Sequence, residues 1–154
     1  LNPNKNLSSI RFNHETYYDK GVLLPALIGR IGINGKMIGI QRIFLDKGGH
    51  KAEIECPKKI LGKSQGGYLE LGSSLEDTLH IAEGIETSLA IHQALNKLTW
   101  AAISANNLSK VKPAKNVKTI HFWADLDRSE TGYKEAKKAV EARTAEGFNC
   151  YIHL

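Results

Sequence analysis

Acidic residues that follow apolar runs are the side chains of this sequence best suited to chemistry. Glu83 follows the run 78–82, and Asp125 and Asp127 follow the run 117–124. In an open parallel sheet, functional groups collect beyond the carboxyl ends of the strands, so these acids would meet if both runs are strands of one sheet. Carboxylates without histidine or thiolate favour Mg²⁺ or Mn²⁺ over zinc. The pattern therefore predicts an all-oxygen site for a hard divalent metal.

Each acidic motif also has an ordinary structural interpretation. Glu83 and Glu86 could be acids in the first turn of a helix, where the helix dipole favours negative charge. Asp127 could be the N-cap of a helix that starts at Arg128. Because two such motifs follow two strands of one small sheet, beside basic segments, we favour the metal site.

Basic residues are concentrated in two parts of the chain. The net charge of +5 comes from 21 Lys and Arg against 16 Asp and Glu. Segment 36–63 holds seven basic residues against three acids, and segment 97–118 holds five lysines and no acid. Such segments can bind a phosphate backbone or a triphosphate, and they can equally be solvated surface. The candidates for phosphate contacts are Arg42, Lys51, Lys58, Lys59 and Lys63.

Length and composition limit the class of protein. The 154 residues, 42% of them hydrophobic, are enough for one domain or a small domain with a subdomain. No apolar run reaches the roughly 18 residues of a membrane helix, and the first residues lack a signal-peptide pattern. We therefore predict a cytoplasmic protein with no membrane partner. Cys56 and Cys150 lie far apart and are predicted to be buried thiols. Because the chain begins with Leu1, we expect a piece of a longer protein.

The period of the apolar residues changes near residue 75 and predicts two subdomains, 1–75 and 76–154. In the first, Asn34-Gly35 is a strong signal for a two-residue hairpin turn. Short alternating segments around it predict a small antiparallel, β-rich unit with one charged face. The strands expected there are 23–33, 36–45, 50–55 and 68–71.

The second subdomain alternates strands with helices, which predicts an α/β fold of βαβ units around a mostly parallel sheet. Its most apolar run, 117–124, is typical of a central strand covered on both faces. We therefore assign Trp100, His121, Phe122 and Trp123 to the core, with His121 hydrogen-bonded there. The strands expected are 78–82, 99–104, 117–124 and 149–154, and the helices expected are 85–96, 106–111 and 130–146.

The sequence around these acids resembles a known family. Glu83-Gly84 after one strand and Asp125-x-Asp127 after another look like the Toprim domain. That domain is shared by bacterial primases, type IA and type II topoisomerases, old-type nucleases and RecR-type repair proteins. Segments 79–90 and 100–108 are similar to the Toprim primases of phages, plasmids and mobile elements, which are often fused to a helicase. Segments that resemble the β-rich region preceding Toprim in those primases are 25–28, 39–42, 45–52 and 57–62.

This resemblance implies a DNA primase that makes short oligonucleotide primers on single-stranded DNA by metal-dependent nucleotidyl transfer. Asp125 and Asp127 would hold Mg²⁺ or Mn²⁺, and Glu83 would be a further ligand or an acid–base group. The basic residues would hold the template and the nucleoside triphosphates, and a helicase domain or protein would be the partner. Bacterial replicative primases carry an aspartate where this chain has Thr87, so a metal role for the neighbouring Glu86 stays open.

Two other functions stay open beside the primase. A nuclease would use the same acids with water as the attacking group, although the β-rich segment argues for the primase. A RecR-type module would bind DNA or a partner without catalysis. No tyrosine stands in the sequence context of a topoisomerase nucleophile, which argues against that class.

Overall fold

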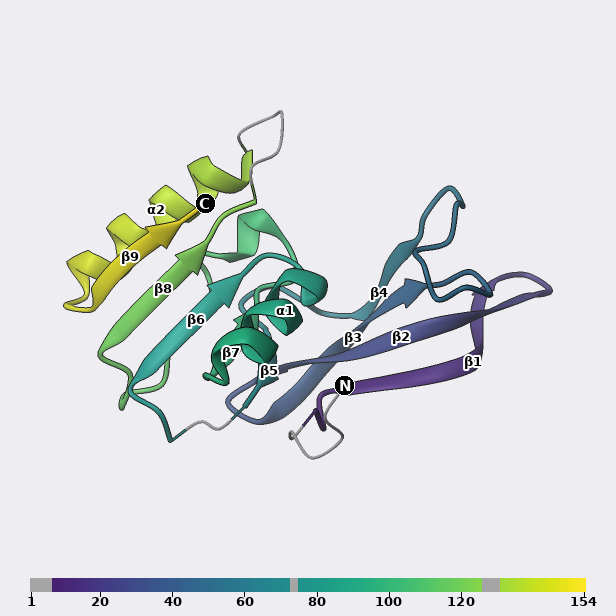
Figure 1. Cartoon of the computed structure of the whole chain (residues 1–154), viewed down its shortest axis with the longest axis horizontal. Coiled ribbons are helices and arrows are strands. Elements are labelled where there is room, and N and C mark those ends of the chain that lie inside the picture. The colour runs from purple at the N-terminus through teal and green to yellow at the C-terminus, as the bar shows by residue number, and fades with distance from the viewer. Residues whose placement is uncertain (1–6, 73–74, 126–130) are drawn as a thin grey trace.

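The antiparallel half of the molecule is a four-stranded sheet at the N-terminal end of the chain (Figure 1). The computed structural model describes residues 7–72, 75–125 and 131–154. The strands pair in sequence order, each antiparallel to the next. They are β1 (Ile10–Asp19), β2 (Val22–Ile33), β3 (Lys36–Phe44) and β4 (Lys58–Gly62).

The hairpin between β2 and β3 is the one that the sequence predicts. Asn34 and Gly35 have φ values of 49° and 79°, as a two-residue turn with two left-handed positions requires. One expected strand is wrong, and two strands are not predicted. Segment 50–55 forms no strand, because Ala52 and Ile54 belong to a loop that packs on the core residue Phe44. Strand β1 is a mostly exposed and polar edge strand, and β4 is a short strand with four exposed residues, so neither has the apolar alternation that indicates a strand.

The second half is a five-stranded, mostly parallel sheet in the order β5-β7-β6-β8-β9 (Figure 1). Only β5, the strand expected at 68–71, runs antiparallel, beside β7. Strand β7 is shorter than expected, and Ile103 just beyond it has a positive φ of 74°. The elements are β5 (Leu69–Leu71), β6 (Thr78–Ala82), α1 (Ile85–Leu95), β7 (Thr99–Ala101), the short 3₁₀ helix η1 (Ala105–Asn107), β8 (Thr119–Trp123), α2 (Thr131–Ala145) and β9 (Asn149–His153).

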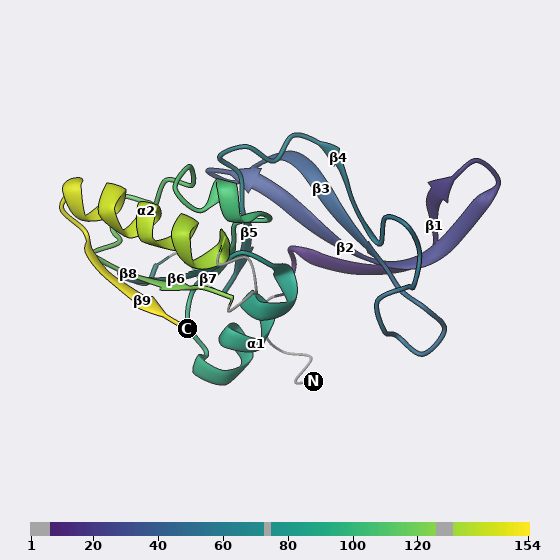
Figure 2. The same ribbon diagram turned by 90° about the horizontal axis from the view of Figure 1, so that it is seen from above.

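The two helices lie on opposite faces of the parallel sheet (Figure 2). Ala136 and Ala139 of α2 pack against Ile81 and Phe122, which together with Trp100 form the main core. Helix α1 packs over β5, β6 and β7 on the other face. The predicted α/β fold, a mostly parallel sheet preceded by an antiparallel β-rich unit, is confirmed.

A shared apolar cluster joins the two halves. Ile31 and Ile43 of the antiparallel sheet pack with Leu69, Ile85 and other residues of the parallel half. At Gly29 a Cβ atom would lie 2.5 Å from Cδ1 of Ile85 and 2.6 Å from Cδ1 of Leu69, so glycine permits the close approach. The position of one half relative to the other is therefore determined by packed side chains.

The cysteines do not follow the prediction of buried thiols. Cys56 is exposed, because it belongs to the surface loop that leads into β4, and Cys150 on the edge strand β9 is half-buried. Burial raises the pKa of the Cys150 thiol. Within the described parts of the chain, no helix has the length and apolar content to cross a bilayer.

Candidate active site

The acids at the ends of β6 and β8 lie at one edge of the parallel sheet. The two strands are parallel neighbours, with Ala82 of β6 in register with Trp123 of β8. Glu83 directly follows β6, and Asp125 stands two residues beyond the end of β8. The strand-end rule therefore brings Glu83 and Asp125 to the same edge, as the sequence predicts.

Asp125 is held among three elements. The hydroxyl of Thr87, in the first turn of α1, lies 3.5 Å from Oδ1 of Asp125 and forms a long hydrogen bond. Gly132, at the start of α2, packs so close that a Cβ atom there would lie 3.0 Å from the backbone oxygen of Asp125. The amide of Ala124 donates to the carbonyl of His153 at 2.9 Å. Asp125 itself is exposed, so its carboxylate can reach a ligand.

The donor chemistry of this edge fits a hard divalent cation. Mg²⁺ in proteins is typically held by about one or two carboxylates, with water and substrate phosphates completing the shell. Glu83 is half-buried and Asp125 is exposed, and both supply oxygen atoms only. Among the described residues no group of three or more His, Cys, Asp or Glu is placed to hold a metal. Asp127, the third predicted ligand, lies outside the described residues.

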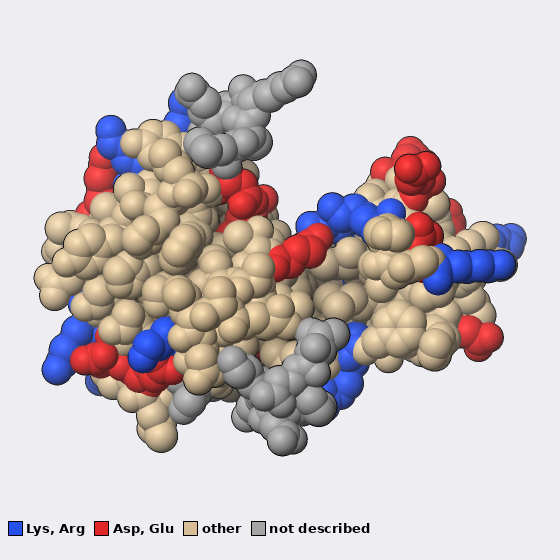
Figure 3. All heavy atoms as spheres, viewed as in Figure 1, with Lys and Arg blue, Asp and Glu red and all other residues tan. Residues whose placement is uncertain are grey.

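Glu86 has its ion-pair partners in the antiparallel half. Its Oε1 lies 2.9 Å from Nζ of Lys58 and 3.7 Å from Nζ of Lys51, and its Oε2 lies 3.1 Å from Nζ of Lys58. Burial raises the pKa of Glu86, but the hydrogen bond and the charges of the two lysines outweigh burial and leave this pKa below its usual value. Figure 3 shows acidic and basic atoms meeting between the two halves.

Arg42 and Lys59, two of the predicted phosphate-binding residues, lie on the face of the antiparallel sheet opposite to Lys58. Neighbouring residues in a strand point to opposite faces, so Lys59 points away from Lys58. Nζ of Lys59 donates to the carbonyl of Tyr18 at 2.9 Å and lies 3.9 Å from the centre of its ring. Arg42, which pairs with Lys59 across the sheet, donates to the carbonyl of Tyr17 at 2.9 Å. These contacts fasten β1 to β3 and β4.

The structure thus brings together only part of the predicted set. Lys51 and Lys58 gather around Glu86, whereas Arg42 and Lys59 contact β1. Lys63 is exposed just after β4. The grouping of lysines with Glu86 was missed, because it depends on how the two halves pack together. The contact between Thr87 and Asp125 was also missed, although a hydroxyl one turn beyond the acidic motif is a signal that could have pointed to it.

A row of rings covers β8 and β9 beside α1. His80, His121 and Tyr151 stand in register on neighbouring strands, and Trp123 stacks on His153 with ring centres 4.4 Å apart. His121 is hydrogen-bonded, as expected, with Nδ1 2.8 Å from Nε2 of His153. The assignment of His121 and Trp123 to the core is wrong, because α1 packs over β5, β6 and β7 and leaves both rings partly exposed. Trp100 and Phe122, on the face that packs against α2, are confirmed as core residues.

Burial and the neighbouring imidazoles change the pKa values of two of these histidines. The pKa of His80 is lowered to about 4, chiefly because the ring is buried and then because His121 and His153 lie beside it. The pKa of His121 is lowered by burial and by the neighbouring His153. Both rings are therefore neutral at pH 7.

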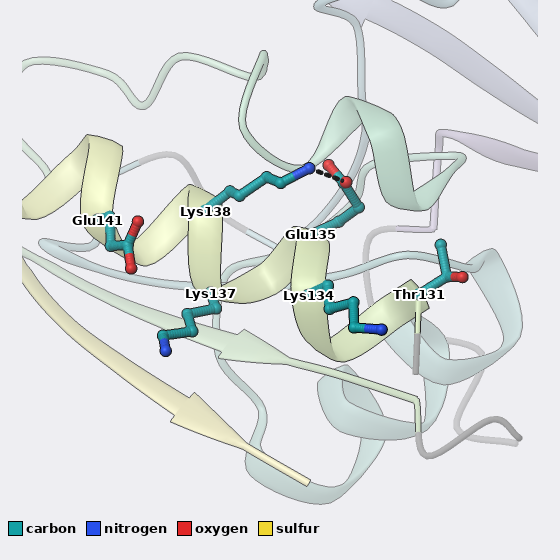
Figure 4. A pocket seen from close by; sticks show the side chains of 6 residues that line it. All are labelled: Thr131, Lys134, Glu135, Lys137, Lys138 and Glu141. Atoms are coloured by element: carbon teal, nitrogen blue, oxygen red, sulfur yellow. Dashed lines mark hydrogen bonds and ion pairs between the residues drawn. The ribbon is translucent and has the colours of Figure 1, made fainter. Parts of the chain in front are cut away.

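A hollow along the outer surface of α2 offers little to a ligand (Figure 4). Five of its six side chains are charged, and Lys138 pairs with Glu135 at 2.6 Å on the same helix. An open helix surface of this kind is ordinary solvated exterior. The residues that line it are Thr131, Lys134, Glu135, Lys137, Lys138 and Glu141.

Comparisons with known proteins match both halves. Residues 78–153 match the Toprim domain, and residues 2–71 match a domain of unknown function (DUF7146). A search of curated proteins found no significant match. A DNA primase domain from Pseudomonas aeruginosa is similar at a TM-score of 0.58 and 16% identity, over 96% of this chain and 48% of that one. The zinc-binding and RNA polymerase domains of the Aquifex aeolicus primase are similar at a TM-score of 0.58 and 14% identity, over 95% of this chain and 38% of that one.

At 16% and 14% identity, the likeness to the two solved structures shows a shared fold and nothing further. It extends over both sheets, since nearly the whole chain is covered. The chain spans about half or less of the length of each solved chain. The Toprim interpretation of the parallel half is confirmed by the match of residues 78–153.

Proposed function

We propose that this chain, whose residues 78–153 match the Toprim domain, is the catalytic core fragment of a DNA primase. It would join nucleotides into short primers on single-stranded DNA, in the cytoplasm. The observation that carries the proposal is the meeting of two kinds of side chain between the halves. Glu83 and Asp125 follow neighbouring strands, and Lys51 and Lys58 approach the first turn of α1 from the other half of the molecule.

Nucleotidyl transfer makes three demands that these residues can meet. The attacking 3′-hydroxyl must lose its proton, the triphosphate must lie in line, and the charge of the leaving pyrophosphate must be neutralised. A bound Mg²⁺ or Mn²⁺ would supply much of that neutralisation. Asp125 and Asp127 would hold the ion, and Glu83 would be a further ligand or would accept the proton.

The lysines of the antiparallel half would position the substrates. Ammonium groups donate to phosphate oxygens without reading the bases, so Lys51 and Lys58 would hold a triphosphate or the template backbone. Both side chains are within ion-pair distance of Glu86, at the start of α1, and they are 50% and 36% exposed. Both lysines would therefore be available to a phosphate that binds at the start of α1.

The likeness across both halves favours the primase over a nuclease. A Toprim nuclease would need the acids, but it would not need the antiparallel sheet that the two primase structures share with this chain. The similarity of segments 79–90 and 100–108 to primases of phages, plasmids and mobile elements supports that type. In such a protein a helicase domain or partner would be expected beyond this chain.

The test is primer synthesis by the longer parent protein. With single-stranded DNA, ribonucleoside triphosphates and Mn²⁺, the parent should make short oligonucleotides. Asp125→Asn should reduce the yield at least about 100-fold, because an amide holds a cation poorly. Asp77→Asn is the matched control, since Asp77 directly precedes β6 at the other end of the strand, and it should keep most of the activity.

Other results would identify a different function. Cleavage of DNA without incorporation of nucleotides, lost in Asp125→Asn, would replace the primase with a nuclease. Neither activity in the presence of Mn²⁺, with DNA binding retained, would favour the non-catalytic module. Circular dichroism of Asp125→Asn and Asp77→Asn is the control for an intact fold, and both spectra should match that of the unchanged protein.

A further inference from the structure

Glu86 occupies an anion site built by the other half of the molecule. The ammonium of Lys58 contacts both carboxylate oxygens, at 2.9 and 3.1 Å, and that of Lys51 lies 3.7 Å from one of them. Lys58 belongs to β4 and Lys51 to the loop before it, while Glu86 belongs to the first turn of α1. Two converging ammonium groups around one acid are the arrangement that a phosphate group also needs.

This anion site lies beside the turn that carries Glu83. A Cβ atom on Gly84 would lie 3.4 Å from Oε2 of Glu86, so the Glu86 carboxylate lies close to that turn. The next residue, Thr87, contacts Asp125 instead. Successive side chains of one helical turn thus face the lysine pair and the candidate metal edge. The lysine pair and the candidate metal edge therefore flank the same helical turn.

Water reaches all three charged groups, which makes the contact exchangeable. The side chains of Glu86, Lys51 and Lys58 are 49%, 50% and 36% exposed. Ion pairs of this exposure contribute little to stability, so breaking this one costs little. A triphosphate carries more negative charge than one carboxylate and offers more acceptor oxygens, so it would be the stronger partner for two lysines.

We propose that Glu86 is an internal competitor for phosphate: it holds Lys51 and Lys58 in the free protein, and the phosphates of an incoming nucleoside triphosphate replace it. The identity of that ligand rests on the proposed function. Glu86 is on this account neither a metal ligand nor a catalytic residue. It keeps two lysines ordered at the edge of the site and lowers their affinity for anions.

The test is the equilibrium affinity of the chain for ATP, measured by titration calorimetry. Glu86→Gln keeps the size of the side chain and removes its charge, so it should tighten ATP binding by up to about 5-fold. Lys58→Gln added to Glu86→Gln should abolish that gain, because the released lysine is then missing. Glu141→Gln on the exposed surface of α2 changes the net charge equally and should leave ATP affinity unchanged.

Three results would overturn the proposal. ATP affinity that is unchanged or lower in Glu86→Gln would make Glu86 an aid to binding or a bystander. A gain that survives Lys58→Gln, or appears equally in Glu141→Gln, would be a general charge effect. Absence of ATP binding to every variant would show that phosphates do not use these lysines.

Inorganic triphosphate, used as a second probe, separates this proposal from the primase. If Glu86→Gln binds inorganic triphosphate more tightly while the parent protein makes no primers, the competition stands and the primase fails. If the parent makes primers and Glu86→Gln shows no gain with either probe, the primase stands and the competition fails.

Discussion

The two sheets of this molecule differ in how they are covered, and the difference explains which residues each contributes. The parallel sheet has α1 and α2 on opposite faces, and β6 and β7 are almost wholly buried. The antiparallel sheet extends away from the helices as a ribbon (Figure 1), with Phe12 and Leu61 more than half exposed. The covered half supplies acids at the ends of buried strands, and the open half supplies lysines that solvent and ligands can reach.

The candidate site exists only where the halves meet. Its acids follow strands of one sheet, and its lysines come from β4 and the loop before it. Neither half contains both kinds of group at this edge among the described residues. Changes that loosen the contact between the halves should therefore affect the site as strongly as changes within it.

The largest effect on stability should come from Asn107, which ties the connecting segment 63–68 to the parallel sheet. Its side-chain amide donates to the carbonyls of Ser64, Gly67 and Ala102 at 3.1, 2.8 and 2.7 Å and accepts from the amide of Gly66 at 2.7 Å. Asn107→Asp would set a carboxylate against three carbonyl oxygens. We expect unfolding free energy to fall by about 4 kcal/mol in urea denaturation.

The adjacent asparagine is a matched control for that change. Asn106 is exposed, so Asn106→Asp should alter stability by less than about 0.5 kcal/mol. Equal losses in Asn106→Asp and Asn107→Asp would show that the buried amide does not join the two halves.

The next largest effect should be a pH dependence of the unfolding free energy that arises in the parallel half. The pKa of His80 is about 4 in the folded protein and near 6.5 when unfolded, so the unfolded chain binds the extra proton between these values. Stability should therefore be complete above pH 6.5 and fall by up to about 3 kcal/mol as the pH drops to about 4. Urea denaturation over this range measures the loss.

Two histidine variants locate this pH dependence. His80→Gln keeps an acceptor for Nε1 of Trp123, which donates to His80 at 3.1 Å, and it should remove much of the loss. His14→Gln changes an exposed residue of β1 and should leave the loss unchanged. If His80→Gln keeps the full pH dependence, the stacked rings of the parallel half are not its source.

The smallest effect separates two adjacent lysines of β4. Lys58 faces Glu86, whereas Lys59 contacts Tyr18. Lys58→Ala should reduce the salt dependence of single-stranded DNA binding by about one unit of slope on a logarithmic plot. Lys59→Ala should leave the slope unchanged and cost about 1 kcal/mol of stability, through lost contacts to Tyr18. Equal slopes for the two variants would contradict the division of this sheet into a ligand-facing and a structural side.

The sequence predicts most of the parallel half well, because its long elements have strong periods and clear ends, but the helix expected at 106–111 is only the 3₁₀ helix η1. Strand β6, helix α1 and helix α2 begin and end within one residue of the predicted limits. The antiparallel half was predicted less well. The alternating residues 50–55 resemble a strand, but they alternate because Ala52 and Ile54 cover the core residue Phe44. Exposed polar edge strands such as β1 lack the apolar alternation that reveals a strand.

The candidate site shows the same limit. That Glu83 and Asp125 share an edge follows from the strand-end rule, which needs only the order of strands and helices. Whether Lys58 or Lys59 pairs with Glu86 depends on which face of β4 each lysine occupies. It also depends on how Ile31, Ile43 and Ile85 pack between the two halves. Those contacts join residues far apart in the chain, and local patterns do not specify them.

A crystal of this chain soaked with Mn²⁺ and ATP tests the central claim, that acids of one half and lysines of the other form a single site. The account predicts anomalous density about 2.1 Å from a carboxylate oxygen of Asp125, with phosphate oxygens at Lys58 and Lys51 in place of Glu86. Anomalous density elsewhere with none at Asp125, or phosphates bound away from both lysines, would contradict it.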